Sequence, residues 1–165
     1  MVVLVSVDER TGEAARAGAL RTDGVDELVS AVIASVVQTP SPPAPPWGTY
    51  LGVDPDTNQV VGSCGFRGEP RAGRVEIAFW TFPPFEGRGW ATAMTRELLA
   101  LTTEHREIRI VLAHTLPERD PSTSVLRANG LRHVGAVRRD ATPTDGGTAV
   151  RGRVWRWEHR VRGGW

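Results

Sequence analysis

Hydrophobic and polar residues alternate over several short runs, and Pro, Gly, Asp and Asn separate these runs from one another. Alternation with a period of two, bounded by turn residues, is the pattern of strands. We therefore predict strands at 2–7, 48–53, 60–66 and 74–82, the last three as an antiparallel meander. Further along the chain, apolar runs predict strands at 108–113, 131–137 and 153–161, with a Thr- and Gly-rich loop at 140–152.

Other segments repeat apolar residues at intervals of three or four, which predicts amphipathic helices. One helix is predicted at 25–37, and a longer one begins near Ala91 and continues past Leu101. Asp120 followed by Pro121 marks the start of a shorter helix, which ends at Asn129-Gly130. The proline-rich stretch 39–46 cannot form regular hydrogen-bonded structure, so we expect an extended connector there.

Length and composition indicate one globular domain over residues 1–165, of which 40% are hydrophobic and 24% charged. The single cysteine, Cys64, excludes an internal disulfide and favours a cytoplasmic location. No apolar run is long enough to span a bilayer, and none resembles a secretion signal. Every basic residue is arginine, which excludes lysine chemistry, and a net charge of +1 gives no general attraction to nucleic acid. We expect no metal site.

The junction between the strand 74–82 and the helix after it carries the most informative motif, Glu86-Gly87-Arg88-Gly89-Trp90-Ala91-Thr92. Glycines allow a tight turn, and the first amides of a helix lack internal partners and lie at the positive end of its dipole. The motif therefore predicts a phosphate site, with Arg88 as an additional charge. A plain helix cap is the alternative. A dinucleotide fingerprint would need glycine at Thr92, and a phosphate-loop NTPase would need a lysine.

Taken together, the order of elements and this motif resemble the GNAT N-acetyltransferase superfamily, and most of all its RimJ/RimL-like branch. The strand Glu76-Ile77-Ala78-Phe79-Trp80 is similar to that branch's Glu-Ile-Gly-Tyr-Trp strand. Residues 117–131 are similar to its Pro-Glu-Asn-x-x-Ser segment and the Val-Leu and Gly-Phe pairs that follow. The resemblance runs from about residue 47 to residue 159.

The resemblance implies an α+β fold: a central, mostly antiparallel sheet of six to seven strands, helices on both faces, and a cleft between two splayed central strands. It implies acetyl-CoA as the cofactor, and direct attack by a primary amine in a ternary complex. The acceptor can be a protein N-terminus, an amino acid or another small amine. By the same resemblance, the cofactor is held by Trp80, Phe82, Gly87, Arg88, Gly89, Trp90, Ala91, Thr92, Arg119 and Ser122.

For the chemistry, Glu76 is the predicted general base, because an amine is mostly protonated at neutral pH and must lose a proton before it attacks. The backbone N–H of Trp80, near a bulge, is the predicted oxyanion donor by resemblance, and Ser122 is the candidate acid. His114, after the strand 108–113, is the second candidate base. Glu76 can instead be a surface carboxylate paired with an arginine, and Ser122 and His114 can be structural.

Three positions depart from the family pattern. Glu86 replaces Gln or Arg, Arg119 replaces an Asn that contacts the pantetheine arm, and Leu126 replaces a tyrosine acid. A non-catalytic acyl-CoA sensor therefore stays open, as does a nucleic-acid-binding module built on the arginine-rich end. It also stays open whether the connector 39–46, Trp155 and Trp157 line the acceptor pocket, and whether the chain forms a homodimer. Cys64 is expected in the core.

Overall fold

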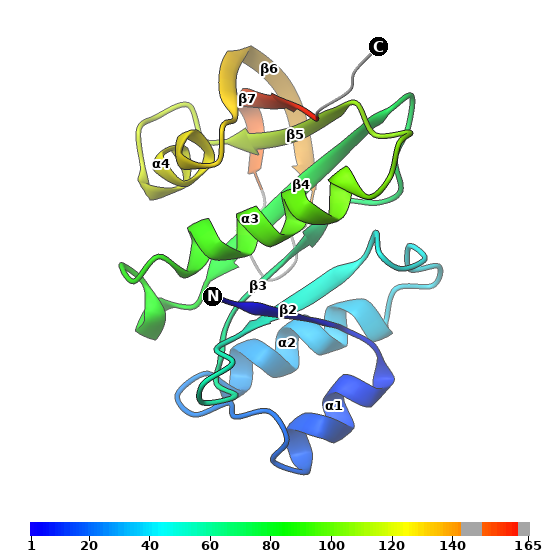
Figure 1. The fold of residues 1–165 in the computed structure, drawn as a ribbon, viewed down its shortest axis with the longest axis vertical. Coiled ribbons are helices and arrows are strands. Elements are labelled where there is room, and N and C mark those ends of the chain that lie inside the picture. Colours follow the sequence, from blue (N-terminus) through cyan, green and yellow to red (C-terminus); the bar gives the residue numbers. More distant parts are fainter. Residues whose placement is uncertain (143–149, 162–165) are drawn as a thin grey trace.

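The computed structural model describes residues 1–142 and 150–161, and its strands form one seven-stranded sheet in the order β1-β2-β3-β4-β5-β7-β6 (Figure 1). Only the central pair, β4 and β5, runs parallel. The strands are β1 (Val3–Ser6), β2 (Thr49–Val53), β3 (Val60–Phe66), β4 (Arg74–Thr81), β5 (Ile110–Thr115), β6 (Arg132–Thr142) and β7 (Val150–Arg160). The helices are α1 (Glu9–Arg16), α2 (Asp26–Val37), α3 (Trp90–Thr103) and α4 (Pro121–Ala128), with a 3₁₀ turn, η1 (Pro83–Phe85).

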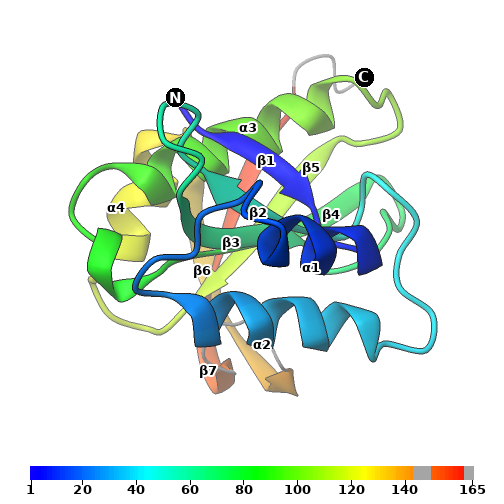
Figure 2. The same cartoon turned by 90° about the horizontal axis from the view of Figure 1, so that it is seen from below.

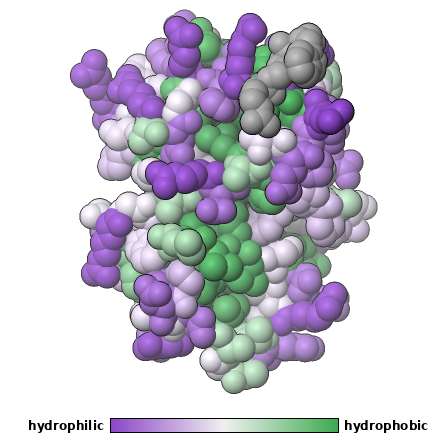
Figure 3. Space-filling model, viewed as in Figure 1, coloured by the Kyte–Doolittle hydropathy of each residue, from purple (hydrophilic) through white to green (hydrophobic). Residues whose placement is uncertain are grey.

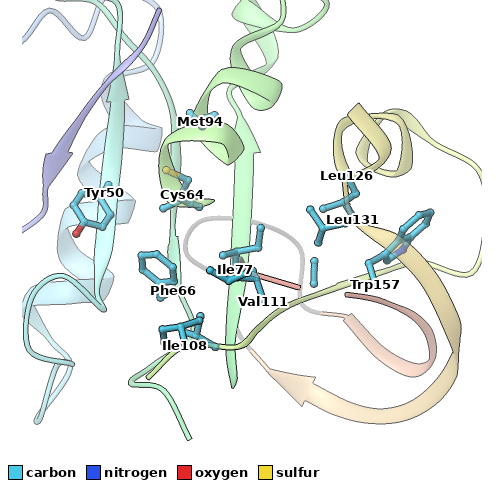
Figure 4. Close-up of a cluster of buried hydrophobic side chains, with 14 of the residues drawn as sticks. Tyr50, Cys64, Phe66, Ile77, Met94, Ile108, Val111, Leu126, Leu131 and Trp157 are labelled. Carbon is cyan, nitrogen blue, oxygen red and sulfur yellow. The ribbon is translucent and has the colours of Figure 1, made fainter. Parts of the chain in front are cut away.

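Helices cover both faces of the sheet, and Figure 2 shows α2 and α3 on opposite sides of it. Strand residues alternate between the two faces, so each face has its own apolar cluster. Val29 and Val32 of α2 pack with Leu51 and Val60 on one face. On the other face, Met94 and Leu98 of α3 and Leu126 of α4 pack over the cluster drawn in Figure 4.

Two glycines let α3 approach the sheet closely. Gly52 and Gly62 are register partners on β2 and β3. A Cβ added at Gly52 would lie 2.5 Å from the Met94 sulfur, and one at Gly62 would lie 2.9 Å from the Met94 methyl carbon. Met94 is itself fully buried. The missing side chains therefore create the space that α3 occupies, and this seats the start of α3 beside β4.

The sheet opens at its centre. β4 pairs with β5 only from Arg74↔Ile110 to Glu76↔Leu112, whereas β4 continues to pair with β3 through Gly62↔Thr81. β5 likewise continues to pair with β7 as far as Thr115↔Trp155. Beyond Glu76, each of the two strands therefore has a neighbour on its outer side only. The splayed pair predicted by the resemblance is confirmed.

Most predicted elements are found within a few residues of their expected bounds. The helix α1 was not predicted, because its sequence carries no apolar stripe. It begins at a capping box formed by Asp8 and Thr11. The loop predicted at 140–152 is too long, because β6 extends to Thr142 and β7 begins at Val150; the rest of that loop lies outside the described residues.

The segment 39–46 forms no helix or strand, as expected. The Tyr50 hydroxyl donates to the Pro46 carbonyl at 2.7 Å, and burial raises the pKa of Tyr50, so the phenol stays a neutral donor. Polar residues cover most of the face seen in Figure 3, with a group of apolar residues near its middle. None of the described helices has the length and apolar character needed to cross a membrane.

Candidate active site

A cavity of about 820 Å³ lies where β4 and β5 part. Its walls come from the ends of β3, β4 and β5, from the loop before α3, and from the first turns of α3 and α4. The predicted site residues among those lining it are Trp80, Gly87, Gly89, Trp90, Ala91, Thr92, His114 and Ser122. The splay thus brings the candidate phosphate loop and the candidate catalytic residues to one space.

The loop before α3 presents backbone donors to this cavity. Gly87 and Gly89 adopt φ values of 76° and 84°, and Gly89 is the N-cap of α3, with no side chain bonded to the cap. The first helical bond is donated by Ala93. Within the described residues, no protein group accepts a hydrogen bond from the amides of 87–92. A row of unpaired amides at the positive end of a helix is a site for phosphate oxygens.

A side-chain contact from α4 holds this helix start in place. Asn129 Nδ2 donates to the Thr92 carbonyl at 3.3 Å and to the Val125 carbonyl at 3.0 Å. Arg88 is exposed, and its guanidinium carbon lies 5.9 Å from the centroid of the Phe85 ring. Arg119 is exposed as well, and neither arginine lines the cavity. Glu86 does line it, so the loop carries a carboxylate where the phosphates are expected.

Alternate residues of β4 hydrogen-bond to β3, and this alternation decides which β4 amides face the opening between β4 and β5. The amide of Arg67 donates to the Glu76 carbonyl, and that of Phe82 donates to the Val61 carbonyl, both at 2.9 Å. Backbone groups of antiparallel strands alternate in direction, so Trp80, like Glu76, bonds towards β3. The same alternation turns the amides of Phe79 and Thr81 towards the gap.

Two predicted backbone roles therefore do not fit. Phe82 is fully buried, its N–H is used by Val61, and its carbonyl accepts from the Phe85 amide at 2.9 Å. The hydrogen bonds that both groups make within the protein do not favour the predicted contact of Phe82 backbone groups with the cofactor. Trp80 lines the cavity with its side chain, but its N–H faces β3. The pairs from Phe66↔Ile77 to Gly62↔Thr81 also follow without a register shift, so the bulge expected near Trp80 is absent from this ladder.

Glu76 belongs to a half-buried charged cluster. Its Oε2 atom lies 3.0 Å from Arg67 Nε and 3.1 Å from His114 Nδ1. Arg156 Nε donates to His114 Nε2 at 3.3 Å. The Glu76 and Arg67 side chains are each 17% exposed, and that of His114 is 7% exposed. His114 and Arg67 line the cavity, whereas Glu76, which contacts both, is not among the lining residues.

This cluster joins the two candidate bases, Glu76 and His114, which the sequence analysis treated as alternatives. It also contains Arg67 and Arg156, which that analysis did not select for the site. Arg67 directly follows β3, and its register opposite Glu76 was the only signal that could have identified it. The alternative interpretation, a solvent-facing Glu76 paired with an arginine, is partly realised: Glu76 pairs with Arg67, but both side chains are largely buried.

Ser122 lines the cavity from the first turn of α4, and its hydroxyl donates to the Asp120 carboxylate. Asp120 also accepts from the Ser122 amide at 2.8 Å, as the predicted N-cap. The serine proton is therefore used in capping α4. Leu126, at the position of the family's tyrosine, is fully buried in the core.

The remaining candidates take structural positions. Cys64 is buried in the core and forms part of the cavity floor. Trp157 is fully buried, with its indole N–H donating to Thr115 Oγ1 at 3.0 Å, and neither it nor Trp155 lines the cavity. No residue of 39–46 lines the cavity either. The cavity wall therefore comes from β3, β4, β5, the loop before α3, and the first turns of α3 and α4.

The sequence matches the family model of the acetyltransferase (GNAT) domain over residues 14–132. A comparison with curated proteins found no match. Among solved structures, a GNAT-family acetyltransferase from Bacillus anthracis superposes with a TM-score of 0.55 at 18% identity, over 68% of this chain and 65% of that one. RimL, a ribosomal L7/L12 alpha-N-protein acetyltransferase solved with coenzyme A, gives 0.56 at 20% identity, over 69% and 62%.

The match therefore spans slightly less than two thirds of the length of these two proteins. A putative phosphinothricin N-acetyltransferase matches along nearly the whole length of both chains, over 98% of this chain and 99% of that one. Its TM-score is 0.62 at 18% identity. At such identities, these structures establish the shared fold.

Proposed function

Because this chain belongs to the acetyltransferase (GNAT) domain family, we propose that it transfers the acetyl group of acetyl-CoA to a primary amine within a ternary complex. One observation carries the proposal. The amides of 87–92 find no acceptor among the described residues, and the loop that bears them lines a cavity formed by two parting strands. Coenzyme A carries a pyrophosphate, which accepts hydrogen bonds from amides of this kind. It also carries a long arm that can lie in the opening between the two strands.

The residues present fit that ligand. The amides from Gly87 to Thr92 would hold the pyrophosphate at the start of α3. The arm would lie in the gap beside β4, where the amides of Phe79 and Thr81 face it. The Thr81 hydroxyl is buried and has no hydrogen-bond partner among the described residues, so it is a further donor for the arm. Arg88 and Arg119, which lie outside the cavity wall, would act only near its mouth.

The thioester of acetyl-CoA supplies the activated acetyl carbon, and the protein must supply a neutral amine. We assign Glu76 as the group that accepts the amine proton. Because Glu76 is not among the residues that line the cavity, one water molecule would carry the proton to it. We assign the Phe79 N–H, rather than that of Trp80, as the donor to the developing negative charge on the acetyl oxygen. A thiol has a pKa of about 8.5, so its departure needs no strong acid, and Ser122 is left as part of the wall.

Cofactor binding is tested by a matched pair of glycine variants. Gly89 and Gly18 have φ values of 84° and 80°, and a Cβ at either would meet no atom within 4 Å. Alanine at either position should cost about 1–2 kcal/mol in unfolding free energy, because it is forced into a left-handed conformation. Only Gly89→Ala should also weaken acetyl-CoA binding, since only Gly89 shapes the amide row. Equal acetyl-CoA dissociation constants for the two variants, measured by calorimetry, would reject the phosphate site.

The catalytic role of Glu76 is tested by thiol release from acetyl-CoA across a panel of amines. Glu76→Gln keeps the shape of the side chain but cannot accept a proton, so we expect kcat to fall by about a hundredfold or more. Glu69→Gln, at an exposed turn, is the control and should leave kcat unchanged. Full turnover by Glu76→Gln at neutral pH would end the assignment. Acetyl-CoA binding without thiol release from any amine would indicate a sensor instead of an enzyme.

A further inference from the structure

Three strands of the sheet contribute one polar side chain each to a row of contacts beside the cavity. Arg156 of β7 and His114 of β5 are register partners. Glu76 of β4 is the register partner of Leu112, two residues before His114. Paired residues, and residues two apart on one strand, share a face of the sheet, so Arg156, His114 and Glu76 project from the same face. The contacts run from Arg156 to His114 and from His114 to Glu76.

His114 lies where the ladder between β4 and β5 ends. The last backbone pair of that ladder is Glu76↔Leu112, and the two strands separate beyond it. His114 is the next residue of β5 on this face, and it lines the cavity. The contact between His114 and Glu76 therefore joins the two strands at the edge of the opening, where the proposed base is needed.

The contact with Arg156 decides which ring nitrogen of His114 carries a proton. A guanidinium has only N–H donors and cannot accept a hydrogen bond. Arg156 Nε donates to His114 Nε2 at 3.3 Å, so Nε2 must offer a lone pair. The ring is then neutral, with its proton on Nδ1. The same contact leaves Nε2 unable to accept a proton from a substrate for as long as Arg156 holds it.

The proton on Nδ1 is buried and needs an acceptor. The His114 side chain is 7% exposed, and its Nδ1 atom forms no aligned hydrogen bond among the described residues. Buried N–H groups in native proteins are nearly always bonded, and Glu76 Oε2 lies 3.1 Å from Nδ1. Hydrogen bonds in active sites often become well aligned only in the complex with substrates. The Nδ1–H group is therefore available to the carboxylate that we assign as the base.

Building on the proposed acetyl transfer, we infer that Arg156 is a positioning residue, which fixes His114 as an Nδ1–H donor to Glu76. His114 is then a second positioning residue and not a base. A base that is oriented by a further group recurs in enzymes that use proton transfer. Arg67 also contacts Glu76, at 3.0 Å, so His114 is not its only partner. Loss of the Arg156 contact should therefore weaken turnover without abolishing it.

The first test measures the tautomer directly and needs no substrate. Proton–nitrogen correlation spectra of the imidazole rings distinguish a protonated from an unprotonated ring nitrogen. At about pH 8, above the ordinary pKa of a histidine, we expect His114 of the full chain to carry its proton on Nδ1. In Arg156→Met, which removes the donor, the tautomer with the proton on Nε2 should appear. A wild-type His114 with its proton on Nε2, or on both nitrogens, would overturn the inference.

The second test measures thiol release from acetyl-CoA with an amine that the wild-type chain acetylates. Arg156→Met should lower kcat by about tenfold, the value of one charge-assisted hydrogen bond, and leave the dissociation constant for acetyl-CoA unchanged. Arg156→Lys keeps a donor and should recover part of the loss. Arg160→Met, at the exposed end of β7, is the matched control and should leave kcat unchanged.

Two substitutions of His114 separate a donor from a base. The amide nitrogen of asparagine is bonded to Cγ, as Nδ1 is, whereas that of glutamine lies one bond further out, towards the position of Nε2. Neither amide can act as a base. We therefore expect His114→Asn to keep more of the wild-type kcat than His114→Gln. An equal and nearly complete loss in both variants would identify His114 as a base and overturn the inference.

The outcomes also separate this inference from the acetyl transfer on which it rests. Full turnover by Arg156→Met would overturn the positioning role alone, while thiol release by the wild-type chain would still support acetyl transfer. No thiol release from any amine would reject acetyl transfer, and the positioning role with it.

Discussion

Glu86 places a negative charge at the proposed phosphate site. It lines the cavity beside Gly87 and Gly89, on the loop whose amides face the expected phosphates. A carboxylate so close to a pyrophosphate repels it, by about 0.5–1 kcal/mol at an exposed position. We expect Glu86→Gln to tighten acetyl-CoA binding about two- to fivefold, measured by calorimetry.

Because Glu86 is exposed, this repulsion is screened by salt. The gain from Glu86→Gln should therefore be largest at low ionic strength and nearly vanish in high salt. Glu9→Gln, on α1 and outside the cavity wall, removes the same charge and should change binding little at either salt concentration. Equal affinities for the wild-type chain and Glu86→Gln at low salt would mean that the phosphates lie elsewhere.

At the level of single residues, the sequence predicted several residues that line the cavity, but it did not predict which side chains contact one another. Glu76 and His114 were found as separate candidates, while their contact depends on the register of β4 against β5. Trp80 and Phe82 were chosen for their backbone groups, and both choices failed to fit for one reason. The direction of an amide is decided by the strand it pairs with, and a single sequence does not reveal the phase of that ladder.

At the level of elements, prediction succeeded wherever a hydrophobic period was strong. β3 was predicted at its observed bounds, and α4 begins and ends at the predicted caps. α1 was missed because only Thr11 and Gly12 of its eight residues are buried, so its sequence shows no apolar stripe. The parting of β4 and β5 leaves no local pattern in either strand. It came from the family resemblance, not from periodicity.

The close packing around Gly62, beside α3 and β4, leads to a prediction about stability. A Cβ at Gly62 would lie 2.4 Å from the Trp80 carbonyl oxygen, a backbone atom that cannot move without disturbing β4. We expect Gly62→Ala to lower the free energy of unfolding by about 1–3 kcal/mol, the usual cost of overpacking, in urea titrations. Gly48→Ala is the control, because its Cβ would meet only the Pro43 carbonyl oxygen, at 3.8 Å. A comparable loss in both variants would show that the cost does not come from the close contacts around Gly62.

For the whole molecule, the opening in the sheet is the feature that connects fold and function. The strands β1 to β4 and the strands β5 to β7 are joined along the sheet by a short parallel ladder, from Arg74↔Ile110 to Glu76↔Leu112. Beyond it, a bound arm would take the place of the missing ladder and bond to backbone groups that the sheet leaves unpaired. We therefore expect a bound ligand to form hydrogen bonds with the unpaired backbone groups of the sheet, and not only to occupy the cavity.

Amide hydrogen exchange measured residue by residue can test this directly, because β4 contains its own control. Ala78 and Trp80 bond towards β3, whereas Phe79 and Thr81 face the gap. In the protein alone, we expect Phe79 and Thr81 to exchange at least about tenfold faster than Ala78 and Trp80. Acetyl-CoA at a hundredfold excess over its Kd stabilises the fold by about 2.7 kcal/mol, which slows globally exchanging amides together. Phe79 and Thr81 should slow beyond that common amount. If acetyl-CoA instead slowed exchange of the Trp80 amide selectively, Trp80 would again be the candidate oxyanion donor. The assignment of the Phe79 and Thr81 amides to the gap, on which the proposed cofactor contacts depend, would then be rejected.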